Sequence, residues 1–170
     1  QDTDYTLSYS DNINVGTATV TLTGTGNYSG TKQVTFDITT KSLTITGLTG
    51  DDKVYDNTTS ATATGTASLL GVEENDDVSL GGTPVFTFAS SNVGTGITIN
   101  TTGYTISGAD AGNYTLTQPT LTADITAKEL TITGLTGDDK VYDNTTSATA
   151  TGTASLLGVE ENDDVSLSGT

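Results

Sequence analysis

Apolar and polar residues alternate with a period of two along much of this chain. In Gly16–Thr23 the alternation sends Ala18, Val20 and Leu22 to one face of an extended segment and the threonines to the other. Threonine suits such positions because its β-branch favours an extended backbone. The pattern predicts half-buried strands here and in five further segments: Val34/Phe36/Ile38, Leu43/Ile45, Ile97/Ile99, Leu121/Ala123/Ile125 and Leu130/Ile132.

Turn residues separate the expected strands at intervals of roughly ten residues, as at Gly50-Asp51-Asp52 and Gly108–Asn113. No segment has the pattern of a long amphipathic helix, although Ala67–Val72 could form one short helical turn. The spacing predicts an all-β chain built of small sandwiches. The expected aromatic anchors of their cores are Tyr55, Phe86, Phe88, Tyr104 and Tyr114.

A segment of 38 residues occurs twice without change, at 43–80 and 130–167, which gives an internal repeat with a period of 87 residues. A period of this size suits one small all-β domain per repeat. The sequence Asn-Val-Gly-Thr at Asn14–Thr17 returns at Asn92–Thr95, so the N-terminal region resembles the second half of a related unit.

The repeat predicts three domains. They are the second half of one unit at 1–40, a complete unit at 41–127 and the first half of the next unit at 128–170.

The charge of the chain excludes several partners. Twenty-one acidic residues and five basic ones give a net charge of −16. Nucleic acids and anionic membrane surfaces attract clustered Lys or Arg, so we expect no binding to either. No run approaches the roughly 18 apolar residues of a membrane span, so we also expect no membrane insertion in this segment.

Catalytic and metal chemistry finds little support in the residue types. The chain has no Cys and no His, which removes Ser-His-Asp and Cys-His arrangements and zinc sites of His and Cys. Carboxylate pairs such as Asp51/Asp52, Glu73/Glu74 and Asp76/Asp77 fit solvated turns better than acid–base catalysis. We therefore expect no enzyme, and no catalytic, cofactor-binding or metal-binding residues.

Calcium is the one cofactor that the residue types give some reason to consider. Asp51, Asp52 and Asp56 are oxygen ligands that we expect near a junction between units. The chain has no EF-hand spacing, so hydrated turns are the better interpretation. Covalent bonds between Lys and Asn or Asp are a second open idea, and the lysines on or beside expected strands are Lys41, Lys53, Lys128 and Lys140.

Several phrases resemble known repeats when they are taken together and in order. Lys53–Thr59, Asn92–Gly96, Ser107–Tyr114 and Ala123–Thr126 resemble the YDG-type repeat of bacterial extracellular proteins. Residues 1–40, through Asn14–Ala18 and Gly26–Thr31, resemble the related MBG-type, bacterial Ig-like repeats.

The chain departs from the YDG-type pattern at one position. Gly usually follows the Tyr-Asp pair, whereas Asn57 and Asn144 stand there in this sequence. Asn is the next-best residue for a left-handed turn, so we expect the turn to be kept.

The resemblance implies tandem Ig-like sandwich domains in a linear array, with β-grasp-like units as the alternative. It also implies a large adhesin-like protein at the bacterial cell surface, with extracellular and biofilm roles and no catalysis. Separately, the matching phase of the repeat at the two ends of the chain predicts a filament. The leading function is then a stalk or spacer, and an adhesive module for glycan, protein or another cell is the alternative. The expected partners are neighbouring copies, head to tail, with strands of 1–40 of one molecule completing residues 129–170 of another.

Overall fold

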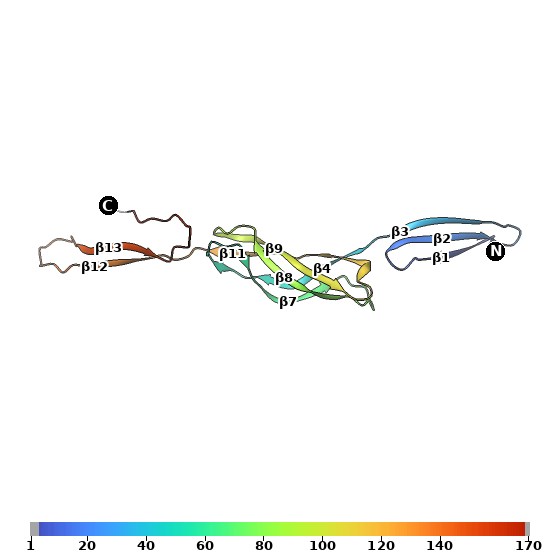
Figure 1. Ribbon diagram of the computed structural model, residues 1–170, viewed down its shortest axis with the longest axis horizontal. Coiled ribbons are helices and arrows are strands. Elements are labelled where there is room, and N and C mark those ends of the chain that lie inside the picture. The colour runs from blue at the N-terminus through green and yellow to red at the C-terminus, as the bar shows by residue number, and fades with distance from the viewer. Residues whose placement is uncertain (1–3, 169–170) are drawn as a thin grey trace. The chain divides into compact units, whose positions relative to one another are not determined.

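The structure, a computed structural model, describes residues 4–168, so Thr170 and the outermost residues of the expected domains 1–40 and 128–170 lie outside the described residues. The described residues form strands joined by turns, with one 3₁₀ turn, η1 at Ala111–Asn113 (Figure 1). No helix within residues 4–168 has the length and apolar character needed to cross a membrane. The strands are β1 Tyr5–Ser10, β2 Gly16–Gly24, β3 Thr31–Ile38, β4 Lys41–Gly50, β5 Lys53–Val54, β6 Ser60–Ala61, β7 Ala63–Leu70, β8 Ser79–Phe88, β9 Gly94–Ser107, β10 Tyr114–Thr117, β11 Thr120–Thr126, β12 Thr131–Gly137 and β13 Ala150–Leu157.

The predicted all-β class is confirmed. The alternating segments lie on β2, β3, β4, β9 and β11, and the last of them ends on β12. The finer expectations, a tandem array of Ig-like sandwiches or of β-grasp-like units, stay predictions.

The first sheet has the order β1-β2-β3, and both pairs are antiparallel. Val20 stands opposite Tyr9 on one side and Val34 on the other. Ala18 is fully buried. The apolar residues of β1 and β3 remain about half exposed, because these three strands carry little of their own to cover them.

Two further sheets contain the strands of the complete repeat. One has the order β10-β4-β7, in which β10 runs parallel to β4 and Leu116 stands opposite Leu43. The other has the order β5-β11-β9-β8-β6, in which β11 and β9 are antiparallel and Leu121 stands opposite Ile99. The short strand β5 adds parallel to the edge strand β11.

The chain divides into two compact units. The first comprises the residues up to Leu48, Gly65–Val85 and Thr101–Pro119, and the second comprises Thr49–Thr64, Phe86–Asn100 and the residues from Thr120 onward. The division runs across β4, β7, β8 and β9.

The core of the second unit is made of Phe88, Ile99, Ala123 and Ile125, all buried. Tyr55 and Phe86 pack against it, as two of the expected aromatic anchors. In the first unit Leu43, Ile45 and Tyr114 are buried, whereas Tyr104 is only partly buried.

A glycine pair brings the backbones of β4 and β7 together. Gly47 and Gly65 both have positive φ, at 87° and 106°. A Cβ on Gly47 would lie 2.2 Å from the carbonyl oxygen of Thr66, and one on Gly65 would lie 2.1 Å from that of Gly47. Only glycine allows this approach. The copies Gly134 and Gly152 repeat it, with 2.2 Å and 2.0 Å for the same contacts.

The short helical turn expected at Ala67–Val72 is wrong, because β7 continues to Leu70. Pairing with β4 overrides the local preference of this segment for a helical turn. Between the two paired strands, the hydroxyls of Thr46 and Ser68 lie 3.2 Å apart. Gly71, with a φ of 106°, follows the end of the strand.

The second copy of the repeat forms the antiparallel hairpin β12–β13, which repeats the sequence of β4 and β7 (Figure 1). Its side chains are far more exposed than their identical counterparts. Ile132 is 60% exposed, whereas Ile45, at the same position of the complete repeat, is 8% exposed. The hairpin therefore forms without the core that buries the same sequence in the complete repeat.

Candidate inter-repeat junction

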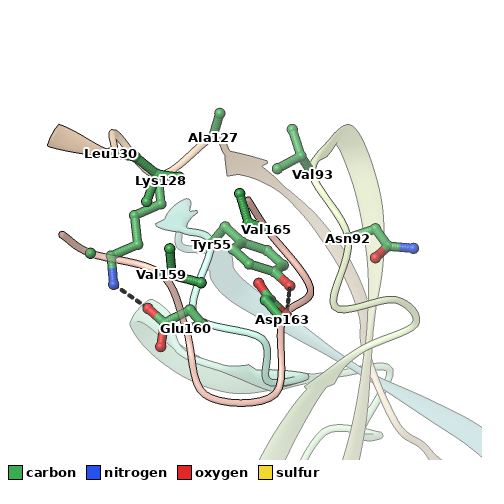
Figure 2. Close-up of a pocket in the computed structure, with 11 residues that line it drawn as sticks. Tyr55, Asn92, Val93, Ala127, Lys128, Leu130, Val159, Glu160, Asp163 and Val165 are labelled. Carbon is green, nitrogen blue, oxygen red and sulfur yellow. Dashed lines mark hydrogen bonds and ion pairs between the residues drawn. The ribbon is translucent and has the colours of Figure 1, made fainter. Parts of the chain in front are cut away.

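The second copy of the repeat begins beside the end of the complete one, and residues of both line a hollow there (Figure 2). From the complete repeat come Tyr55, Asn92, Val93 and Ala127. From the second copy come Lys128, Leu130, Gly158, Val159, Glu160, Asp163 and Val165.

Tyr55 is placed by strand pairing and by the core. It follows β5, which pairs with the end of β11, and its backbone N–H donates to the carbonyl of Thr126 at 2.9 Å. Its ring packs against the core of the second unit. The side chain is thus held at the end of the repeat, where its hydroxyl points to Asp163 (Figure 2).

The turn after Tyr55 is tightly bonded within itself. Oδ1 of Asp56 accepts hydrogen bonds from Nζ of Lys53 at 2.7 Å and from the N–H and hydroxyl of Thr58, each at 2.9 Å. Asn57 has a φ of 59°, so the expected left-handed turn is confirmed, as it is at Asn144 with 54°. The Lys53 ammonium lowers the pKa of the Asp56 carboxyl to about 2.

The segment that meets this turn is the Glu160–Asp163 loop. The N–H of Asp163 donates to the carbonyl of Glu160 at 3.2 Å, and Asn162 has a φ of 70°. The identical loop Glu73–Asp76 of the complete repeat has the same bond at 3.2 Å, and its Asn75 has a φ of 73°. The two copies of the loop therefore share one turn conformation.

Two hydrogen bonds join the Tyr55 turn to this loop. The hydroxyl of Tyr55 donates to Oδ1 of Asp163 at 3.1 Å, and Nδ2 of Asn57 donates to the carbonyl of Glu161 at 3.2 Å. The bond to the carboxylate favours the protonated phenol, and it raises the pKa of Tyr55 above its usual value. Nζ of Lys128 forms an ion pair with Glu160 beside these bonds (Figure 2).

A second hollow lies where residues 1–40 meet the complete repeat, and it is built from corresponding residues. Asn14 and Val15 take the places of Asn92 and Val93, while Lys41, Glu73 and Asp76 take those of Lys128, Glu160 and Asp163. The two hollows have similar volumes, 310 and 330 Å³. They are two instances of one junction between consecutive units.

Hydrogen bonds also cross this second junction. The N–H of Val15 donates to Oδ1 of Asn113 at 2.9 Å, and Nδ2 of Asn113 donates to Oδ1 of Asn14 at 3.2 Å. Nζ of Lys41 pairs with Glu73, and this bond raises the pKa of Lys41. The Lys–Glu pair is thus present at both junctions.

The loop of the complete repeat is also bonded to a tyrosine of its own repeat. The hydroxyl of Tyr114 donates to Oδ2 of Asp76 at 2.5 Å and accepts a bond from the N–H of Glu73 at 3.0 Å. The bond to Asp76 raises the pKa of Tyr114. Sequence reasoning expected Tyr55 and Tyr114 only as core anchors and missed the role of both hydroxyls.

The turn aspartates that we considered for calcium have partners within the protein. Oδ2 of Asp51 accepts the hydroxyl of Thr62 at 2.7 Å, Oδ1 of Asp52 accepts the N–H of Asp124 at 2.7 Å, and Asp56 binds Lys53. Across residues 4–168 no group of three or more Asp or Glu side chains is placed to hold a metal ion. The carboxylates act here as acceptors that satisfy turn and strand N–H groups.

The four lysines considered for covalent bonds reach carboxylates and other oxygens. Lys41 and Lys128 pair with glutamates, whereas Lys53 and Lys140 bind Asp56 and Asp143 in their own turns. Within residues 4–168 the hydrogen bonds of these four amines go to oxygens of Glu, Asp, Thr and Ser residues.

Comparison with known proteins identifies one family. The YDG domain matches residues 39–122 and again residues 126–170. No curated protein matches the chain. No solved structure matches it either.

This match corrects the expected assignment. The family is the YDG domain and not the bacterial Ig-like, MBG-type repeat of adhesin-like proteins, and residues 1–38 lie outside both matched segments. The adhesin, extracellular, filament and biofilm roles expected above are corrected as well, because the match supports the YDG domain family alone. Because the two matched segments cover most of the 170 residues, the chain belongs to the YDG domain family.

Proposed function

We propose that the chain is a structural segment, a stalk or spacer of consecutive repeats with no catalytic chemistry of its own. The observation that carries this proposal is the repetition of one junction. Asn14 and Val15 lie beside Lys41, Glu73 and Asp76 at one boundary, and Asn92 and Val93 lie beside Lys128, Glu160 and Asp163 at the other, each with the same Lys–Glu ion pair. A spacer needs joints that are built alike at each boundary, whereas a recognition surface needs distinct residues in one place.

The strength of such a joint comes from several contacts acting together. An exposed ion pair contributes little by itself. At the junction between the complete repeat and the second copy it is accompanied by the bonds of Tyr55 and Asn57, and the apolar side chains of Val93, Leu130 and Val165 line the same hollow. We include in the proposal that each complete repeat is a small sandwich and that these sandwiches follow one another in tandem.

A series of lengthened chains tests the spacer role. One, two or three further copies of residues 41–127 would be inserted after residue 40, and the maximum dimension of each chain would be measured by small-angle X-ray scattering. We expect each copy to add the same increment, because each adds the same junction. Increments that shrink with each copy would show flexible joints and would contradict the proposal.

A second candidate function, head-to-tail completion between molecules, is favoured by the exposed faces of the two half-units. Tyr28 of the N-terminal half is 63% exposed, whereas Tyr114, which follows the same Gly-Asn pair in the complete repeat, is 6% exposed. Ile132 and Ile45 show the same contrast in the C-terminal half. Each half therefore exposes what the other half covers in a complete unit.

Sedimentation of the 170-residue chain over a range of concentrations tests this second candidate. We expect association that grows with concentration and that Ile132→Asp abolishes, because a charge cannot be buried in the completed core. Thr133→Asp, on the opposite face of the same strand, is the matched control and should associate normally. A chain that stays monomeric at every concentration would exclude completion between molecules.

A further inference from the structure

The loop aspartate of the repeat meets a different tyrosine in each of its two copies. Asp76 accepts the hydroxyl of Tyr114, which belongs to the same repeat. Asp163, at the identical position of the next copy, accepts the hydroxyl of Tyr55, which belongs to the preceding repeat. The same sequence position thus bonds to its own repeat in one copy and to the preceding repeat in the other.

The two tyrosines use different oxygens of the carboxylate. Tyr114 donates to Oδ2 of Asp76, and Tyr55 donates to Oδ1 of Asp163. Because both copies of the loop have the same turn conformation, the two tyrosine positions can be considered together around one carboxylate, which has two oxygens. A carboxylate has about four lone-pair positions, so it can accept both bonds.

Among residues 4–168, each of the two aspartates accepts a hydrogen bond from one tyrosine hydroxyl. Residues 1–40 hold no counterpart of Tyr55, and among the described residues none donates to Oδ1 of Asp76. Within residues 4–168, Tyr55 is the tyrosine that donates to Asp163.

We propose that the loop aspartate, Asp76 or Asp163, clasps two consecutive repeats by accepting two tyrosine hydroxyls, one from the Tyr114 position of its own repeat and one from the Tyr55 position of the preceding repeat. The proposal rests on the spacer function and specifies its joint. The Tyr-Asp turn of the repeat is then a docking element whose partner is the Glu-Glu-Asn-Asp loop of the following repeat.

The same rule assigns a partner to the exposed turn of the second copy. Tyr142 is 86% exposed, and its hydroxyl donates to Oδ1 of Asn144 in its own turn, at 3.3 Å. Its partner is the loop aspartate of the next repeat, which is Asp76 of a second molecule when the units join head to tail. Tyr28, at the Tyr114 position, is then the partner of Asp163.

A lengthened chain makes both bonds available to Asp163 at once. A copy of residues 84–127 appended after Thr170 completes the second repeat and brings in a copy of Tyr114. The pKa of each tyrosine in the 170-residue chain and in the lengthened chain would be followed by NMR of ring-labelled tyrosine, with single Tyr→Phe variants for assignment.

We expect the pKa of Tyr55 to stay raised when the second repeat is completed, and the pKa of the appended tyrosine to be raised as well. Asp163→Asn should then lower both values and leave that of Tyr114 unchanged. Asp76→Asn is the matched control, and it should lower the pKa of Tyr114 alone. If completing the repeat lowers the pKa of Tyr55 to its value in Asp163→Asn, the two tyrosines compete and the clasp is excluded.

A second variant covers the case in which Asp163→Asn loosens the loop. Tyr55→Phe keeps the ring in the core and removes only the hydroxyl. Amide hydrogen exchange in Glu160–Asp163 should become faster in this variant and unchanged in Tyr142→Phe, and equal exchange in both would overturn the proposal. Failure of the clasp leaves the spacer test intact, because the increment in length per repeat is measured separately.

Discussion

The hydroxyl of Tyr55 donates to Oδ1 of Asp163 at 3.1 Å, although the two residues lie 108 positions apart in the chain. Tyr55 belongs to the core of the complete repeat, and Asp163 to the loop of the next copy. A residue that packs against the core of one repeat thus also bonds to the repeat that follows it. The core of the complete repeat and its junction with the next copy therefore both depend on the Tyr55 side chain.

A substitution at Asn57 can test the junction bond without disturbing the turn. Asn57→Gly keeps the left-handed turn, since glycine adopts positive φ freely, and removes only the bond to Glu161. We expect its effect on the main unfolding transition to be below about 1 kcal/mol. Faster hydrogen exchange in residues 158–163 would be the direct sign of the lost junction bond.

The copy of this residue provides the control. Asn144 has the same left-handed turn, with a φ of 54°, and its side chain has no bond to a following loop among the described residues. Asn144→Gly should leave exchange in residues 158–163 unchanged. Equal effects of the two variants would show that the Asn57 bond does not hold the junction.

Identical residues in the two copies should differ in their contribution to stability. Ile45→Ala removes a side chain that is 8% exposed, and a loss of about 2–5 kcal/mol is expected for a buried residue of this kind. Ile132→Ala removes one that is 60% exposed and should change the stability of the monomer by about 0.5 kcal/mol or less.

Urea unfolding of both variants at low protein concentration measures this difference. The low concentration matters because association between molecules would bury Ile132 as well. A large loss in Ile132→Ala under these conditions would show that the second copy has a core of its own, against the exposure seen in the structure.

Much of the fold could be predicted from the sequence, because a period of two in the side chains is a direct consequence of strand geometry. Ala18, Ile99, Ala123 and Ile125 all lie on the face that the alternation indicates, and all are buried. The prediction of a helical turn at Ala67–Val72 was wrong because it considered only the local sequence and not the pairing with strand β4.

The junction could be predicted only in outline. The repeat showed that two copies of one segment must meet, and it placed acidic turns nearby. It did not show that Asp163, rather than Asp51, Asp52 or Asp56, would form the hydrogen bond between the two repeats. That bond depends on the direction in which the Tyr55 side chain extends from the core. Two loops with the same sequence and different tyrosine partners are visible only in three dimensions.

The glycine pair of β4 and β7 should tolerate no side chain. A Cβ on Gly47 would meet the carbonyl oxygen of Thr66 at 2.2 Å, and its φ of 87° also disfavours other residues. Gly47→Ala should therefore lower the free energy of unfolding by more than about 1 kcal/mol, because the two backbones must separate. Thermal melting followed by circular dichroism measures the loss.

Gly112→Ala is the matched control for this substitution. A Cβ on Gly112 meets no atom within 4 Å, so the alanine fits without displacement. We expect a melting temperature close to that of the parent chain. If the Gly47→Ala chain has the same melting temperature as the Gly112→Ala chain, β4 and β7 are not held in the close pairing described.

The turn that carries Tyr55 should respond to acid through Asp56. Its pKa is lowered to about 2, first by the bond from Lys53 and then by the N–H of Thr58. A carboxyl whose pKa is lower in the folded state stabilises that state above its unfolded pKa of about 3.9. This stabilisation is lost as the pH falls from about 4 towards 2, and urea unfolding of the parent chain and of Asp56→Asn over this range measures it. The parent should lose stability more steeply than the variant, whereas parallel curves would show that the Lys53–Asp56 pair does not stabilise the turn.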